Sequence, residues 1–166
     1  MNAKWKKVKS MVEAARILVV DDDISIRKSV ATILEEEGYI VDTAGTGEEA
    51  TKKSHSNFFN LALIDIRLPD MEGTKLLTDL KETVPKMVKI IITGFPSLPN
   101  AIEAVNRGAD AYVLKPFDVE KLLEMIKEHL KKQQESQKYS EEKVADFVET
   151  RFRMWEKERE SDNRER

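Results

Sequence analysis

The chain has 166 residues, of which 40% are hydrophobic and 36% are charged, and its formal net charge is -3. This length corresponds to roughly one domain, and the near balance of 28 basic and 31 acidic residues argues against binding to nucleic acid mainly by bulk charge. Because there is no cysteine, disulfide scaffolds, cysteine–zinc sites and thiol nucleophiles are excluded. No apolar run approaches the roughly 20 residues of a membrane span, and no signal peptide is apparent. We therefore expect a soluble, cytoplasmic protein.

The sequence divides into three parts by composition. All 6 glycines and all 5 prolines lie in the middle of the chain, so turns are concentrated there. We expect a basic leader at residues 1–15, either helical or disordered, a folded domain at 16–132, and a charged helical tail at 133–166.

In chain order, short apolar runs alternate with segments in which apolar residues recur at helical spacing. The runs predict buried strands at residues 17–20, 39–41, 61–64, 88–92 and 111–114. The helical spacing predicts helices around residues 26–34, 46–54, 76–80, 101–105 and 122–130. Gly38 and Gly108 end the first and fourth of these helices, and Thr46 is an expected N-cap of the second. Five strands alternating with five helices predict an α/β fold, with a parallel sheet covered by helices on both faces.

Polar side chains follow the predicted strands at the points where they end. In an open parallel sheet, the carboxyl ends of the strands form one edge, and ligands bind there. The residues that reach this edge come from four strands: Asp21, Asp22 and Asp23 after the first, Asp65 after the third, Thr93 and Gly94 after the fourth, and Lys115 and Pro116 after the fifth. We therefore expect carboxylates, one hydroxyl and one ammonium to converge from distant parts of the sequence.

The composition of this cluster limits its chemistry. Crowded carboxylates repel one another unless a cation lies among them or some are protonated. Oxygen ligands in an open site suit Mg²⁺, and a metal together with Lys115 would neutralise a phosphoryl group. A carboxylate such as Asp65 can attack phosphorus and form an acyl phosphate, with Thr93 donating a hydrogen bond to a phosphoryl oxygen. The cluster therefore predicts a site at which an aspartate is phosphorylated.

Four segments in order resemble the receiver domain of two-component response regulators, of the stand-alone, chemotaxis-regulator-like kind. They are Ile17-Leu-Val-Val-Asp-Asp-Asp23, Leu63-Ile-Asp-Ile-Arg-Leu-Pro-Asp-Met-Glu-Gly73, Ile91-Ile-Thr-Gly94 and Gly108-Ala-Asp-Ala-Tyr-Val-Leu-Lys-Pro-Phe117. The resemblance covers about residues 16–132 and implies a flavodoxin-like fold with strand order 2-1-3-4-5. It also implies phosphoryl transfer from a histidine kinase or a phosphotransfer protein, and a protein that catalyses only its own phosphorylation and dephosphorylation.

The resemblance assigns roles residue by residue. It makes Asp65 the phosphoacceptor and Lys115 the phosphate-contacting lysine, whose bond to Pro116 is expected to be cis. It makes Asp21, Asp22, Asp65 and the backbone carbonyl of Arg67 the Mg²⁺ ligands, and it leaves Asp23 out. Thr93 is the switch hydroxyl and Tyr112 the switch aromatic, and the family's readout surface is the fourth helix, fifth strand and fifth helix.

Two residues at the rim of the expected site bear on how long the phosphoryl group lasts. Arg67 lies two residues after the acceptor, and Phe95 lies two residues after the switch threonine. A long basic side chain and a bulky apolar one should screen the phosphoryl group from water, so we expect slow autodephosphorylation.

A second interpretation of the acidic cluster is a haloacid-dehalogenase-like magnesium phosphatase. Such an enzyme needs a nucleophile and a second acid two residues later, after the first strand, and Asp21 with Asp23 has that spacing. This interpretation leaves Asp65 and Thr93 without a role, and the chain lacks the large cap segment.

The tail carries the other unassigned pattern. Ser140 is an expected N-cap, with 133–138 before it either a continuation of the previous helix or a linker. Apolar residues then share one helical face, in a stripe too short to predict a coiled coil. Three alternatives follow for this face: it folds back on the domain, it binds a partner or a second copy, or the tail is disordered.

Too few turn residues follow Lys132 for a helix-turn-helix unit, so we expect no direct binding to DNA. The sequence favours a response regulator that acts by protein–protein contact on an unknown output protein, with the C-terminal helix as a candidate contact. The alternative is a transcriptional regulator that acts through a DNA-binding partner or as a tail-mediated homodimer.

Overall fold

The computed structural model describes the backbone of residues 14–162, with side chains to residue 157 and at 159. The expected leader at 1–15 thus lies almost entirely outside the described residues. The chain divides into two units, one ending at Leu130 and the other beginning at Lys131. No helix among the described residues is long and apolar enough to span a membrane.

The first unit alternates strands and helices, as expected. The strands are β1 (Arg16–Val20), β2 (Ile40–Ala44), β3 (Leu61–Asp65), β4 (Val88–Thr93) and β5 (Ala111–Leu114). The helices are α2 (Ile24–Glu36), α3 (Gly47–Ser56), α4 (Gly73–Asp79), α5 (Leu98–Asn106) and α6 (Val119–Asp162). All strand pairs are parallel, in the order β2-β1-β3-β4-β5, which confirms the predicted flavodoxin-like fold.

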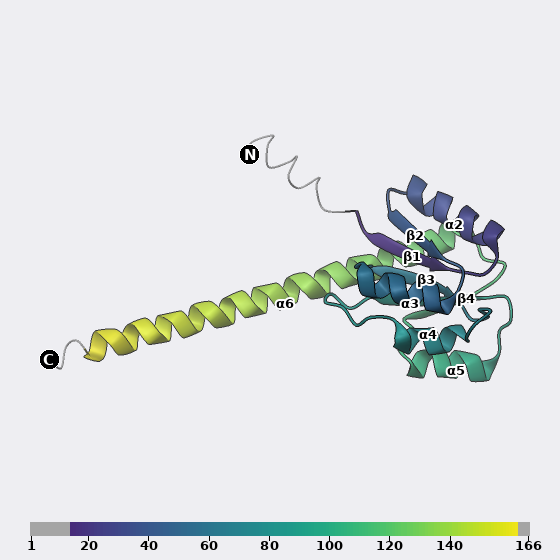
Figure 1. The fold of residues 1–166 in the computed structure, drawn as a ribbon. Helices are drawn as coiled ribbons and strands as arrows, with labels where there is room; N and C mark the ends of the chain where they lie inside the picture. Colours follow the sequence, from purple (N-terminus) through teal and green to yellow (C-terminus); the bar gives the residue numbers. More distant parts are fainter. Residues whose placement is uncertain (1–13, 163–166) are drawn as a thin grey trace. The chain divides into compact units, whose positions relative to one another are not determined.

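The sheet lies between two apolar layers because successive strand residues point to opposite faces. In β1, Leu18 and Val20 join the core beneath α3, α4 and α5, whereas Ile17 and Val19 join the core beneath α2 and the first turns of α6. Figure 1 shows α2 on one side of the sheet and α3, α4 and α5 on the other. This packing fixes all five strands in register and leaves their carboxyl ends at one edge.

Several local signals are confirmed. Gly38 and Gly108 have φ of 91° and 94° and follow α2 and α5 closely, a backbone conformation that glycine adopts without steric cost. The hydroxyl of Thr46 accepts a hydrogen bond from the backbone N–H of Glu49 and caps α3. The peptide bond between Lys115 and Pro116 is cis, as expected.

Two local predictions were wrong. Ser140 does not begin a helix: α6 runs without a break through residues 133–140, and the Ser140 hydroxyl donates to the carbonyl of Ser136 one turn earlier. The segment 133–138 is therefore helix rather than linker, because no glycine or proline interrupts it. The second strand also extends to Ala44 instead of ending at Val41.

Candidate functional site

The strand ends bring the predicted site residues to one edge of the sheet. Asp65 is the last residue of β3 and lies opposite Ile92 of β4, and Thr93 ends β4 opposite Leu114 of β5. Asp21 directly follows β1, and Lys115 directly follows β5. Residues up to 94 positions apart in the sequence thus meet through strand order alone.

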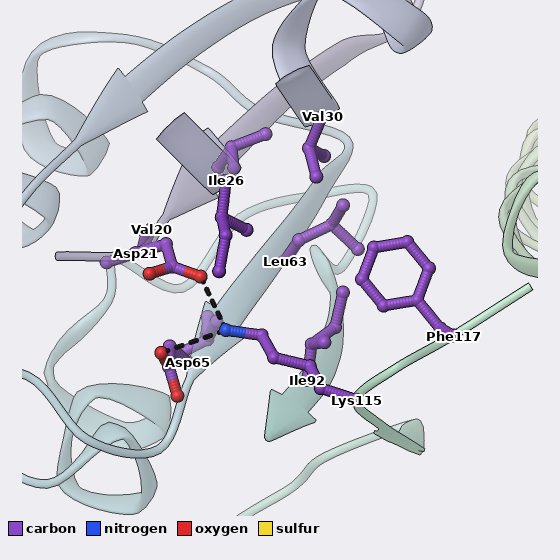
Figure 2. A pocket seen from close by; sticks show the side chains of 11 residues that line it. Val20, Asp21, Ile26, Val30, Leu63, Asp65, Ile92, Lys115 and Phe117 are labelled. Atoms are coloured by element: carbon purple, nitrogen blue, oxygen red, sulfur yellow. Dashed lines mark hydrogen bonds and ion pairs between the residues drawn. The ribbon is translucent and has the colours of Figure 1, made fainter. Parts of the chain in front are cut away.

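Lys115 connects the two buried carboxylates of the site. Its Nζ lies 2.7 Å from an Oδ atom of Asp21 and 3.2 Å from an Oδ atom of Asp65. Figure 2 shows the ammonium between the two carboxylates, with its methylene chain beside Ile92. The three side chains close the polar end of a pocket whose other end is apolar, with Val30, Leu63 and Phe117 among its lining residues.

The charges of this cluster are only partly compensated. Burial raises the pKa of Asp65, Lys115 opposes that change, and the neighbouring Asp21 adds to it. Burial also acts to lower the pKa of Lys115, but its hydrogen bonds and charge interactions with Asp21 and Asp65 outweigh burial and raise it. The ammonium therefore stays charged, and one cation is shared between two carboxylates.

The third acid makes the cluster suitable for a divalent cation. Carboxylate oxygens of Asp21, Asp22 and Asp65 lie within 4.8 Å of one another. Asp22 is exposed while the other two are buried, so the group opens toward solvent on one side. Three oxygen donors in an open, negatively charged site fit Mg²⁺, which keeps several waters when bound. This is the donor set that the sequence predicted, apart from the Arg67 carbonyl, whose role as a ligand stays a prediction.

Local hydrogen bonds hold the acidic turn after β1. The second carboxylate oxygen of Asp21 accepts from the backbone N–H of Asp23, and the Asp21 carbonyl accepts from the Arg27 guanidinium at 2.6 Å. Asp23 itself caps α2 by accepting from the N–H of Ile26. The capping role accounts for Asp23 and keeps it apart from the three clustered carboxylates.

The two expected switch residues lie at β4 and β5. Thr93 is fully buried, and its hydroxyl accepts from the backbone N–H of Phe95. The ring of Tyr112 packs against the core beneath α3, α4 and α5. Its hydroxyl is buried and has no hydrogen-bond partner among the described residues. A buried hydroxyl without a partner is energetically costly, so packing and not a hydrogen bond holds the Tyr112 ring in this position.

Arg67 and Phe95 form a pair at the mouth of the site. The Arg67 guanidinium carbon lies 3.7 Å from the centre of the Phe95 ring. The backbone N–H of Arg67 donates to Asp65, and that of Phe95 donates to Thr93, so both residues are anchored at the rim. The sequence indicated that each would flank the site, but it did not predict that they stack.

Asp70 is a site-supporting residue that sequence reasoning missed. Its carboxylate accepts from the backbone N–H groups of Gly47 and Glu48 at 2.9 and 2.8 Å, and these bonds lower its pKa. The loop between β3 and α4, which carries Arg67, is thereby tied to the N-terminus of α3. At the end of the same loop, a Cβ on Gly73 would lie 2.1 Å from the Asp65 carbonyl oxygen.

Comparison with known proteins agrees with this geometry. The sequence model of the response regulator receiver domain matches residues 17–127. The transcriptional regulatory protein ZraR of Klebsiella oxytoca is 38% identical over 118 residues, which are 71% of this chain and 27% of that protein. The chain therefore spans only about a quarter of the length of this curated relative.

Two solved structures are similar to the chain. A receiver domain protein (CheY-like) from Methanospirillum hungatei has 50% identity and a TM-score of 0.72, covering 75% of this chain and 99% of that one. A response regulator protein from Burkholderia pseudomallei, solved with a phosphorylated aspartic acid, calcium ion and citrate, has 33% identity and a TM-score of 0.61. The match covers 66% of this chain and 64% of the Burkholderia chain.

Proposed function

We propose, from the premise that this chain belongs to the response regulator receiver domain family, that it is a phosphoacceptor regulator modified on Asp65. The donor is a sensor histidine kinase or a phosphotransfer protein. A receiver domain is not an enzyme in the usual sense, since its only chemistry is performed on itself. The observation that carries the assignment is the Lys115 ammonium held between Asp21 and Asp65.

The transfer forms one bond and breaks one bond at phosphorus. A carboxylate oxygen of Asp65 attacks, and the bond to the donor nitrogen of a phosphohistidine, or to the acyl oxygen of acetyl phosphate, breaks as the donor leaves. Asp21, Asp22 and Asp65 would hold Mg²⁺, which would supply charge neutralisation at the phosphoryl group when bound. The Lys115 ammonium is already within reach of Asp65 and neutralises the phosphoryl oxygens on one side. The Thr93 hydroxyl donates to one of those oxygens.

Phosphorylation is read out on the surface of α5, β5 and α6, which are the fourth helix, fifth strand and fifth helix of the sequence prediction. Movement of Thr93 toward the phosphoryl group would open space into which Tyr112 can turn, and the orphan hydroxyl of Tyr112 supports a second position for this ring. The same surface exposes large apolar side chains, namely Leu98, Ile102, Val105 and Leu114.

Hydrogen exchange tests the readout surface. With the phosphorylated and unmodified proteins compared at equal Mg²⁺, we expect exchange to change at residues 95–130, which include α5, β5 and the first-unit part of α6, and little in β1 and β2. Identical exchange across residues 95–130 would contradict the proposed readout.

Magnesium-dependent labelling tests the phosphoacceptor. Acetyl phosphate should label the unmodified protein only when Mg²⁺ is present, and Asp65→Asn should abolish this labelling. Asp23→Asn is the matched control because Asp23 caps α2 outside the cluster, and it should label normally. Retained labelling of Asp65→Asn at an unchanged rate would refute the assignment. Continuous turnover of a phosphate monoester that depends on Asp21 and Asp23 would instead support the phosphatase interpretation.

A second candidate function is transcriptional regulation through a DNA-binding partner. It is favoured by the similarity to ZraR, which is named as a transcriptional regulatory protein. A gel shift with fragmented genomic DNA and the proteins that this chain captures from a cell extract, with and without phosphorylation, separates the two candidates. A DNA-binding partner predicts a shifted band that contains this chain, whereas action on a protein that does not bind DNA predicts no shift in either state.

A further inference from the structure

The second unit of the chain presents a largely apolar face on α6. The large apolar side chains on this face are each about half exposed: Val144 62%, Phe147 62%, Val148 59%, Phe152 56%, Met154 51% and Trp155 49%. No element of the second unit other than α6 is available among the described residues to cover them. Six such side chains within three turns of helix need a partner in water.

The face has a centre and two unlike sides. At about 100° per residue, a central line is formed by Val144, Phe147, Arg151 and Met154. An apolar flank lies on one side, formed by Val148, Phe152 and Trp155. A polar flank lies on the other, formed by Lys143, Thr150 and Lys157. Any occupant must therefore match an apolar flank, a polar flank and a cation in the centre.

We propose that the occupant is the same segment, residues 143–157, of a second copy of this chain, packed antiparallel. A two-fold axis perpendicular to the two helices brings like flanks together, so the apolar flank meets the apolar flank of the other copy. A parallel pair brings unlike flanks together and would set Val148 and Trp155 against Lys143 and Thr150. The distribution of side chains thus favours the antiparallel pair.

Arg151 supports the same choice and sets the register. In a parallel pair, Arg151 would face Arg151 of the other copy, and like charges in an apolar interface repel. In an antiparallel pair centred on residue 149, Arg151 faces Phe147 of the other copy, and Val144 faces Met154. The guanidinium already lies 5.5 Å from the ring centre of Phe147 in its own helix. In the pair it lies between two aromatic faces, which is a favourable position for a cation.

The area is sufficient for a specific contact. Large apolar side chains cover on the order of 150–250 Å² each when aromatic, and those of this face are about half exposed. Pairing therefore removes on the order of 500 Å² from water per copy and roughly 1,000 Å² in total, which is near the lower limit for a specific interface. The contact uses no residue of the phosphorylation site, since all of its residues lie in the second unit.

Sedimentation of the full-length chain tests the association. The unmodified protein should be in monomer–dimer equilibrium at micromolar concentrations, and Phe147→Ala with Trp155→Ala should weaken the dimer at least about tenfold, since aromatic anchors dominate such contacts. Alanine maintains helix formation. Glu149→Ala with Arg153→Ala is the matched control, because these residues pair on the opposite face, and it should leave the dimer unchanged. A purely monomeric protein, or a dimer that survives loss of both aromatics, would overturn the proposal.

Disulfide trapping tests the orientation without ambiguity because the chain has no cysteine of its own. A mixture of Val144→Cys and Met154→Cys proteins should form a mixed disulfide on mild oxidation, whereas Val144→Cys alone should not link. Self-linking of Val144→Cys with no mixed product would show a parallel pair and refute the antiparallel arrangement. Acetyl phosphate labelling of Asp65 in every variant confirms that the first unit is folded. Phosphorylation of Asp65 and pairing of residues 143–157 are thereby tested separately.

Discussion

The stack of Arg67 on Phe95 should slow loss of the phosphoryl group. Hydrolysis needs a water in line with phosphorus, opposite the Asp65 oxygen. The two stacked residues are anchored beside the acceptor by backbone hydrogen bonds to Asp65 and Thr93, and we expect their side chains to cover that approach. Neither side chain is an acceptor for the proton of the attacking water. We therefore expect the stack to open before water attacks.

The strength of the stack sets the size of the effect. An exposed cation–π contact contributes about 0.5–1 kcal/mol, and about 1.36 kcal/mol corresponds to a tenfold change in rate. Arg67→Asn and Phe95→Ala should each accelerate decay about two- to fivefold. Because each substitution removes the same contact, the double variant should decay about as fast as either single variant and not at the product of their rates.

The assay follows phosphate release from purified phosphoprotein after acetyl phosphate is removed, at saturating Mg²⁺. Arg107→Asn is a matched control, since Arg107 pairs with Glu103 at the end of α5, and its decay should equal that of the unmodified protein. Unchanged decay in both single variants would refute the screening argument. Multiplicative acceleration in the double variant would show that the two residues act separately and not as a stack.

Two further substitutions probe the loop between β3 and α4. Gly73→Ala should destabilise the fold by about 1–3 kcal/mol in urea unfolding, because the new methyl group meets the Asp65 carbonyl oxygen at 2.1 Å. Gly94→Ala is the control: the atom nearest to its new methyl group lies at 3.8 Å, so its loss of unfolding free energy should be smaller. Asp70→Ala should cost about 1 kcal/mol at neutral pH, as for a lost helix cap. Since the pKa of Asp70 is lowered in the folded state, its contribution is complete above the unfolded carboxyl pKa and is lost as the pH falls through the folded pKa. A pH-independent difference for Asp70→Ala would contradict a role for its charge.

The fold was predictable because the spacing of apolar residues identifies the strands and helices, and their alternation along the chain implies a parallel sheet. Runs such as residues 61–64 and 88–92 are apolar at every or nearly every position, which is typical of strands covered on both faces. The second strand was harder, because Asp42 and Thr43 continue an edge strand with polar side chains. Its true end at Ala44 is set by pairing with Val20, a long-range contact.

The site was predictable to the extent that residues lie at strand ends. Asp21, Asp65, Thr93 and Lys115 each follow or end a strand, so the sheet order brings them together. Asp70 lies in a loop and binds α3 23 positions earlier in the sequence, and nothing in its local sequence predicts that contact.

At Ser140 the local sequence predicted a feature that the structure does not have, whereas at Asp70 it failed to predict one that exists. The N-cap signal of Ser140 is local, and an uninterrupted helix overrides it.

The most direct test of phosphorylation at Asp65 is the chemical location of the phosphoryl group. Borohydride reduces an aspartyl phosphate to homoserine, so the protein is treated with acetyl phosphate and Mg²⁺, reduced, digested and sequenced by mass spectrometry. Phosphorylation at Asp65 predicts homoserine at position 65 and an aspartate at positions 21, 22 and 23. Homoserine at any of those three positions, or at none with Asp65 unmodified, would contradict it.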